Sequence, residues 1–245
     1  MLFNRVLRRL FPQKSKRYGH IISLGYNCEV SYQFFLKYHF VESSLFSWVN
    51  TLNIDNLLTG LSDIDSVCSG KTENVNPMWK CFNTNIHFHG RAPMDIWNHN
   101  PSIEIIEKDK KELLSRVAHL KLKFINTAND GKKNLYIFKY PVKDESVQII
   151  KNKIDKLFLA LKNICKNEFD LLVIFENNTA INIENLIDNP RIYIRRVQFF
   201  MPEDNVTGEN SDSKNFGKIF NEFRPNFKLK TEKKFKFEKL HLIIF

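Results

Sequence analysis

The chain lacks several sequence patterns that identify common classes of protein. None of its apolar runs reaches 18 residues, so no membrane-spanning helix is expected. No Cys-x-x-Cys pair occurs, which argues against a zinc ribbon. The glycine patterns of nucleotide-binding loops and the Gly-x-Ser-x-Gly elbow of serine hydrolases are also missing. Nucleotide binding through a glycine loop and hydrolysis through a serine elbow are therefore not supported.

Glycine and proline are scarce, with 8 of each in 245 residues, whereas phenylalanine occurs 22 times. Hydrophobic residues make up 43% and charged residues 26% of the chain, as in ordinary globular domains. A chain of this length can bury a large core. We therefore expect one domain over residues 18–245, preceded by a basic amphipathic segment, 1–17, and ending in a basic tail, 224–245.

Cysteine is also infrequent, and the four residues, Cys28, Cys68, Cys81 and Cys165, are far apart in the sequence. The start of the chain has no uninterrupted apolar stretch, so no cleavable signal peptide is expected. Disulfides are rare in the reducing cytoplasm. We therefore expect a cytoplasmic protein whose four thiols are free.

Positive charge is concentrated at the two ends of the chain, whose net charge is +10. Residues 1–20 contain six basic residues and no acid, and residues 224–245 contain seven Lys or Arg and two Glu. Such ends predict an anionic partner, either a membrane surface or a nucleic acid.

Each basic end has a pattern of its own. Residues 1–11 place apolar side chains on one helical face and arginines mostly on the other, which suits either a membrane interface or docking on the protein's own surface. In residues 227–245 lysine alternates with Phe or Leu, which suits an exposed sheet edge better than a nucleic-acid groove. We expect an anionic membrane to bind residues 1–17, at the inner face of the membrane, and we do not expect nucleic acid as a partner.

Strand-like and helix-like segments alternate along the chain. Strands are expected at residues 20–25, 134–140, 169–175 and 191–199. Helices are expected at residues 54–61, 103–124, 144–165, 182–187 and 215–223. The run FDLLVIF at 169–175 suits a parallel strand buried on both faces. The pattern predicts an α/β fold, with a layered, mostly parallel central sheet and helices on both faces.

Residues 21–50 contain the segment that points to a function. A short apolar run is followed by Gly25, which permits a tight turn, and then by Asn27 and Cys28 at the start of a helical pattern. A thiol at a helix N-terminus has a lowered pKa, and the thiolate is the reactive nucleophile. The alternative is a buried cysteine that packs behind the turn.

Three motifs in this part of the chain resemble a known family. They are Ser23-Leu24-Gly25-Tyr26-Asn27-Cys28, then Leu45-Phe46-Ser47-Trp48, then Phe88-His89-Gly90. Together they are similar to the S-L-G-x-x-C, P-F-D-W and F-x-H-D motifs of a bacterial family identified as papain-like cysteine peptidases, over residues 20–140. Ser47 and Gly90 stand where that pattern has acids. The resemblance implies a Cys nucleophile and a His base on a papain-like fold, whereas the periodicity favours the layered sheet.

The resemblance makes His89 the first candidate for the base. His87 is the second, because it lies on the same face of the expected strand. Backbone N–H groups near Cys28 and Glu29 are candidate donors to an oxyanion. The group that orients the imidazole stays open among Asn27, Asn83, Asn85 and Asp95, since an asparagine serves in papain-like sites.

A metal site is the alternative use of the same histidines. His87 and His89 together with either His99 or Cys81 offer three ligands, but their spacing matches no zinc signature. We therefore expect no metal and no cofactor.

These features predict a thiol-dependent hydrolase or acyl transferase, with Cys28 as nucleophile and His89 as base. The substrate is open, and a role in surface-polysaccharide metabolism at the inner leaflet fits the basic ends of the chain. The alternative is a non-catalytic domain that binds or scaffolds at a membrane surface. In an enzyme, Cys28 would lie within about 4 Å of a histidine nitrogen across a concave pocket.

Overall fold

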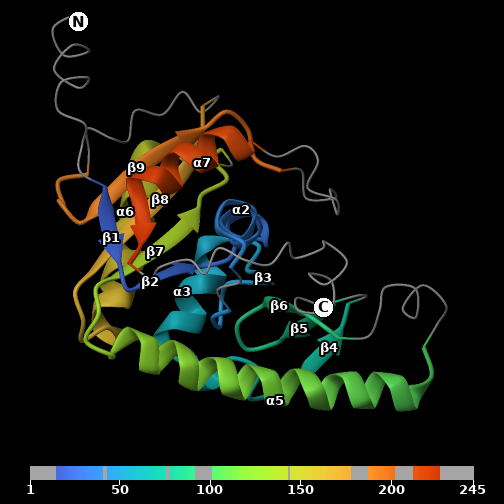
Figure 1. Cartoon of the computed structure of the whole chain (residues 1–245). Helices are drawn as coiled ribbons and strands as arrows, with labels where there is room; N and C mark the ends of the chain where they lie inside the picture. Colours follow the sequence, from blue (N-terminus) through green and yellow to red (C-terminus); the bar gives the residue numbers. More distant parts are fainter. Residues whose placement is uncertain are drawn as a thin grey trace, which may run out of the picture.

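The computed structural model describes residues 15–40, 43–75, 78–91, 101–142, 144–177, 187–201 and 212–226. Its main sheet has four strands in the order β2-β7-β8-β9, and all neighbouring strands are parallel (Figure 1). These strands are β2 (His20–Ser23), β7 (Asn134–Lys139), β8 (Phe169–Glu176) and β9 (Ile192–Val197). The predicted α/β class with a mostly parallel sheet is confirmed.

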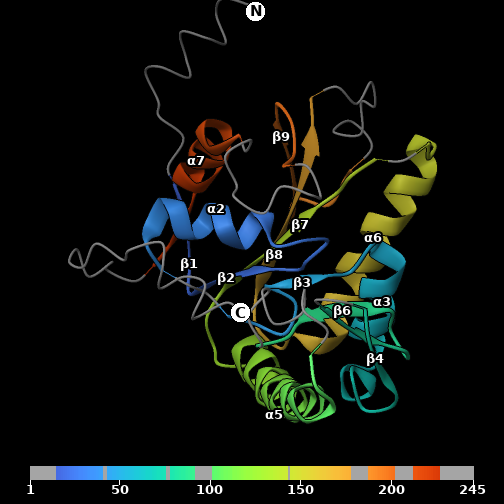
Figure 2. The same cartoon turned by 90° about the vertical axis from the view of Figure 1, so that its right-hand side faces the viewer.

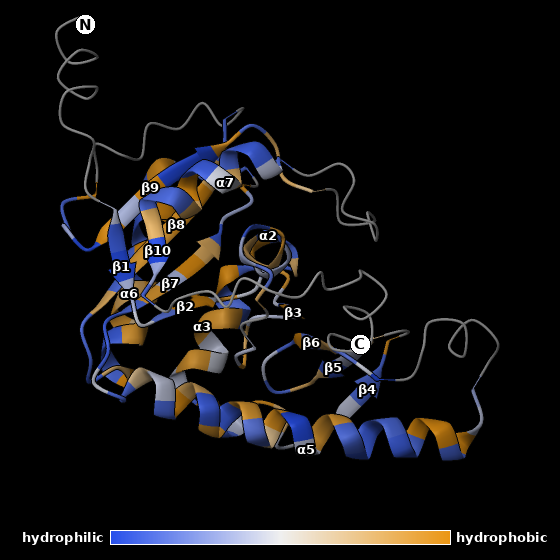
Figure 3. Ribbon diagram, in the orientation of Figure 1, coloured by the Kyte–Doolittle hydropathy of each residue, from blue (hydrophilic) through white to orange (hydrophobic). Residues whose placement is uncertain are grey.

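The two central strands are buried along almost their whole length, as the apolar run in β8 predicts. Alternate side chains of the sheet enter two different hydrophobic clusters. One cluster includes side chains of α5 (Ile103–Ala128) and α6 (Val147–Ile164). The other includes side chains of α2 (Glu29–Tyr38) and α7 (Ser213–Glu222). The apolar stripes of these helices appear as orange bands in Figure 3.

Side-chain caps fix where several helices begin. Asn53 accepts a hydrogen bond from the Asn56 N–H at the start of α3 (Ile54–Ser62), as predicted. Ser102 and Ser146 cap α5 and α6 in the same way. Because its apolar stripe continues to Ala128, α5 is four residues longer than expected.

A second, antiparallel sheet lies beside the first and was not predicted. Its order is β3-β6-β5-β4, and α5 runs along it (Figures 1 and 2). Its strands are β3 (Val49–Asn50), β4 (Thr72–Asn74), β5 (Met78–Cys81) and β6 (Ile86–His89). The β5–β6 hairpin contains the strand predicted to carry His87 and His89. The segment 63–77 contains β4 and the short helix η1 (Ile64–Ser66).

A third pairing joins the two ends of the described chain. β1 (Lys16–Tyr18) pairs in parallel with β10 (Phe223–Pro225). The expected amphipathic helix at 1–11, most of the helix at 182–187 and the tail beyond residue 226 lie outside the described residues. In the part of the chain that is described, no helix is both long and apolar enough to span a bilayer.

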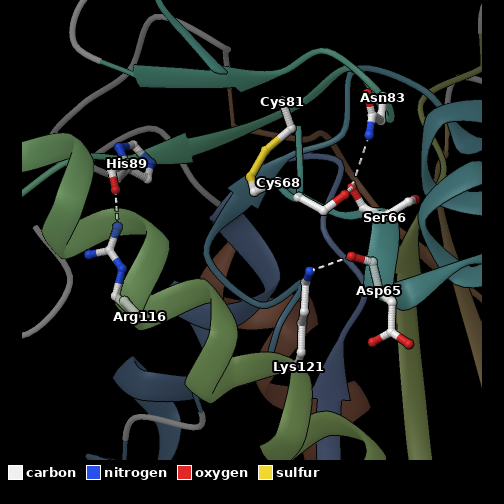
Figure 4. Close-up of a disulfide and its surroundings, with 9 residues drawn as sticks. Asp65, Ser66, Cys68, Cys81, Asn83, His89, Arg116 and Lys121 are labelled. Carbon is white, nitrogen blue, oxygen red and sulfur yellow. Dashed lines mark hydrogen bonds between the residues drawn. A yellow bond between two sulfur atoms is a disulfide. The ribbon is translucent and has the colours of Figure 1, made fainter. Parts of the chain in front are cut away.

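The expectation of four free thiols is wrong for two of them. Cys68 and Cys81 form a disulfide, with their Cα atoms 5.0 Å apart (Figure 4). Both side chains are buried, so the bond ties the turn after η1 to the end of β5 inside the small sheet. The expectation came from the assumed compartment, whereas antiparallel folding of residues 68–81 brings the two sulfurs together. Cys28 and Cys165 are free.

Candidate active site

Cys28 lies where β2 passes through a tight turn into α2. Gly25 and Tyr26 both have positive φ angles, 83° and 68°, and Cys28 is the N-cap residue of the helix. A Cβ atom on Gly25 would come 2.8 Å from the Thr51 side chain, so both the φ angle and the space require glycine. The Tyr26 N–H donates to the Thr51 hydroxyl at 3.0 Å, which fixes the turn against the residues that follow β3.

His89 ends β6 in the small sheet and faces Cys28. The distance from Cys28 Sγ to His89 Nε2 is 3.2 Å. His87 and His89 are half-buried on one face of β6, while Phe88 between them is buried on the other, as the strand alternation predicts. The structure therefore brings together a cysteine at the start of α2 and a histidine at the end of β6.

His87 lies on the same face but two residues farther from the thiol. It is opposite Lys80 and Asn50 in the sheet register, and its buried Nε2 has no hydrogen-bond partner among the described residues. Burial and the nearby Lys80 charge lower the pKa of His87. Of the two histidines, His89 is the one in contact with Cys28.

The environment of the pair favours neutral side chains. Burial raises the pKa of the Cys28 thiol to about 12, and the ammonium of Lys139 opposes this rise only in part. Burial, followed by the charge of Arg116, lowers the pKa of His89 to about 4. The expected lowering of the thiol pKa is therefore wrong, because loss of hydration outweighs the helix terminus. At neutral pH the pair is a thiol and an uncharged imidazole.

Asn27 serves the start of α2 and does not orient the imidazole. Its Oδ1 accepts from the Glu29 N–H at 3.1 Å and from Lys139 Nζ at 3.3 Å. Because the Glu29 N–H is engaged in this way, the expectation that it serves an oxyanion is wrong. The Cys28 N–H stays a candidate donor.

The other expected orienting groups lie away from His89 or outside the described residues. Asn83 donates to the Ser66 carbonyl at 3.5 Å (Figure 4). Asn85 occupies a positive-φ turn, and its carbonyl accepts from Asn56. Asp95 belongs to the undescribed segment 92–100.

A carboxylate from α5 occupies the space where the resembled motif has an acid. A Cβ on Gly90 would come 2.3 Å from Asp109 Oδ2. This carboxylate accepts from Trp79 Nε1 and from the Arg91 N–H, both at 2.6 Å. Asp109 is 4% exposed. Because its two hydrogen bonds go to Trp79 on β5 and to Arg91 just after β6, it connects these two strands to α5 inside the core.

Arg116, also on α5, donates to the backbone carbonyl of His89 (Figure 4). The sequence analysis missed Arg116 and Asp109. Asp109 did leave a signal, because it is spaced four and eight residues from Leu113 and Val117 in the apolar stripe of α5. An acid in such a stripe needs buried donors.

The second motif position, Ser47, is fully buried. The Ser31 hydroxyl of α2 donates to the Ser47 carbonyl, while the Ser47 hydroxyl has no hydrogen-bond partner within the part of the chain that the structure describes. Ser47 therefore packs behind α2, and its backbone fixes that helix.

A buried ion pair lies next to Cys28. Lys139 Nζ is 2.7 Å from Glu29 Oε2, and the two residues are 1% and 0% exposed. Glu29 Oε1 also accepts from the Met201 N–H at 2.8 Å. Burial raises the pKa of Glu29 while Lys139 lowers it. The sequence analysis considered the backbone N–H of Glu29 but not its side chain, and it did not consider Lys139. A lysine at the end of the apolar segment NLYIFK did indicate a buried charge that needs a partner.

The metal alternative loses ligands in this structure. Cys81 is in the disulfide, His99 lies outside the described residues, and no cluster of three His, Cys, Asp or Glu side chains occurs among those described. Two hollows occur near the site, but among the described residues neither is lined by Cys28 or His89. The concave pocket expected across the pair stays a prediction.

No family model, no curated protein sequence and no solved structure matches the chain. The resemblance to bacterial papain-like cysteine peptidases thus stays a prediction from three short motifs. Function has to be argued from the geometry around Cys28.

Proposed function

We propose that the protein is a thiol-dependent hydrolase or acyl transferase in which Cys28 is the nucleophile and His89 the base. The observation that carries this proposal is the 3.2 Å contact between Cys28 Sγ and His89 Nε2. The two residues are 61 positions apart, one at the start of α2 and the other at the end of β6. A nucleophile within hydrogen-bond reach of a base is the arrangement that covalent catalysis needs.

The neutral resting pair determines how the proton moves. As Cys28 Sγ bonds to an acyl carbon, its proton passes to His89 Nε2, and the carbonyl oxygen becomes an oxyanion. The leaving group departs with the proton from His89, which leaves a thioester on Cys28. Water or another acceptor, deprotonated by His89, then attacks the thioester and releases the acyl group. Attack and proton transfer are thus coupled, as in serine enzymes.

A non-catalytic, membrane-surface binding domain is the second candidate. The observation in its favour is that neither hollow among the described residues is lined by Cys28. In that case the Cys28–His89 contact is a packed, hydrogen-bonded pair.

Acylation of the protein by an activated thioester or ester probe separates the two functions. An enzyme should gain one acyl group by intact mass spectrometry, lose it with Cys28→Ala and lose most of the rate with His89→Gln. Cys165→Ala is the matched control, because Cys165 is the other free, half-buried thiol and its Sγ lies 3.1 Å from the Tyr136 hydroxyl, where Cys28 Sγ has His89. Equal acylation of Cys28 and Cys165, or no acylation of folded protein, would reject the enzyme.

We also propose that residues 1–17 bind an anionic membrane surface from the cytoplasmic side, where lipid-linked precursors of surface polysaccharides would be accessible. The support is the charge of this segment. The Cys68–Cys81 disulfide is unusual for a reducing compartment. Trapping thiols with an alkylating agent in intact cells therefore tests the location, because cytoplasmic protein should carry few intact disulfides.

A further inference from the structure

We propose that the buried pair of Lys139 and Glu29 sets the reactivity of Cys28, with Lys139 promoting and Glu29 restraining formation of the anionic sulfur. Lys139 is a positioning residue here, since it acts on the nucleophile through charge and through Asn27.

The first support is where the ammonium of Lys139 makes its contacts. It reaches Asn27 Oδ1 at 3.3 Å and Glu29 Oε2 at 2.7 Å, which are the side chains immediately before and after Cys28. One buried cation at the carboxyl end of β7 therefore holds both neighbours of the nucleophile. These contacts fix the first turn of α2 and with it the direction of Cys28 Sγ toward β6.

The second support is the surroundings of the ammonium. Lys139 Nζ lies 4.5 Å from the ring centroid of Phe200 and 5.3 Å from that of Tyr26. Aromatic walls and nearly complete burial keep the local dielectric low, so a charge there acts on Cys28 more strongly than a surface lysine would. The positive charge favours the negative sulfur and the oxyanion that follows it.

The third support is that a buried ion pair is a poor device for stability alone. Desolvation of two charges offsets much of their attraction, and an apolar pair of similar volume is often as stable. An apolar pair would join β7 to α2 as well but would have no electrostatic effect on the thiol. The pair thus fits a role at Cys28 better than a role in packing.

All charged groups around the thiol have to be considered when its titration is measured. Lys139 on β7 acts on the thiol by its charge, Glu29 on α2 pairs with Lys139, and His89 on β6 contacts the thiol directly. Arg116 on α5 acts on His89, and Glu176 on β8 acts on Glu29. Only Lys139 and Glu29 are changed in the test, so the other three contributions remain constant.

The test measures the rate of iodoacetamide alkylation of Cys28 against pH, without substrate, in the full chain. Glu29→Gln removes the negative charge and leaves Lys139 in place, so the rate at pH 7 should rise about tenfold, as for a one-unit fall in thiol pKa. The double variant Lys139→Met with Glu29→Gln removes both charges and should fall about tenfold below Glu29→Gln. Lys139→Met alone is avoided because it would leave a buried carboxylate unpaired.

Lys139→Arg keeps the positive charge and is the conservative rescue, expected to retain most of the native rate. The alkylation rate of Cys165 in the same samples reports loosening of the fold. If Glu29→Gln does not accelerate alkylation of Cys28, if the double variant reacts as fast as Glu29→Gln, or if Cys165 changes in parallel, the pair is only structural and the proposal is overturned.

Because this role rests on the proposed function of Cys28, the two failures must be separable. Absence of acylation together with a faster Glu29→Gln and a double variant about tenfold slower than Glu29→Gln would reject the enzyme and retain the electrostatic role. Acylation with an alkylation rate indifferent to both charges would retain the enzyme and reject the role of the pair.

Discussion

Acidification should destabilise the folded protein through His89. In the folded chain the pKa of His89 is about 4, against 6.5 for an ordinary histidine. Between these values the unfolded chain binds a proton that the folded chain does not, so stability rises with pH in this range. The stabilisation is complete above about pH 7 and is lost as the pH falls toward 4.

The size of the effect follows from the two pKa values. The shift from 6.5 to about 4 corresponds to a maximum of about 3 kcal/mol, and about 2 kcal/mol of it is lost between pH 8 and pH 5. The measurement is urea-induced unfolding at both pH values for the native protein and for His89→Gln. The native protein should lose about 2 kcal/mol more than the variant.

His87→Gln is the matched control, because this residue lies on the same strand and face and its pKa is also lowered. It should remove less of the pH dependence than His89→Gln, since the lowering of the pKa is large for His89, to about 4, and smaller for His87. Equal losses in the native protein and His89→Gln would show that His89 is not held neutral. The coupled proton transfer proposed for Cys28 would then have to be replaced by a preformed ion pair.

Three further outcomes are expected. Deletion of residues 1–14, which spares β1, should release the protein from anionic liposomes, since four basic residues contribute about 1 kcal/mol each; equal co-sedimentation of both forms would contradict this. Alkylation of Cys28 should be slow at pH 7, and its rate should rise about tenfold per pH unit up to pH 10, because burial raises the pKa of Cys28 to about 12. A rate that stops rising below pH 9 would contradict this high thiol pKa. Asp109→Ala should lower the free energy of unfolding in urea by about 3 kcal/mol, because it removes the acceptor of the hydrogen bonds from Trp79 and the Arg91 N–H. Asp109→Asn should lower it by less. A loss below about 1 kcal/mol for Asp109→Ala would show that these two donors find other acceptors.

The main sheet and its helices could be predicted because their signals are local. The apolar run in β8 and the amphipathic periodicity of α6 depend only on neighbouring residues. The small sheet could not be predicted in the same way. Its strands β3 and β4 have two and three residues, too few to establish an alternation, and their stability comes from pairing with β5 and β6.

At the candidate site, the positions of Cys28 and His89 could be predicted from the sequence, but the pKa shift of the thiol could not. Strand, turn and helix placed Cys28, and alternation around Phe88 placed His89. The sign of the thiol pKa shift depends on burial by residues distant in sequence. The contacts of Lys139 with Glu29, 110 positions away, arise only when β7 has entered the sheet.

The β1–β10 pairing also determines how the molecule responds to mechanical force. The chain enters at the start of β1 and leaves at the end of β10, and the two strands are parallel. Tension between the two ends would therefore slide these strands past one another and load their hydrogen bonds together, rather than peel them open singly. The Asn226 N–H, which donates to the Tyr18 carbonyl at 2.7 Å, would share this load. If one end is held at a membrane, force applied to the other end acts first on the β1–β10 pair. The force reaches the main sheet, whose strand β2 leads to Cys28, only after that pair has separated.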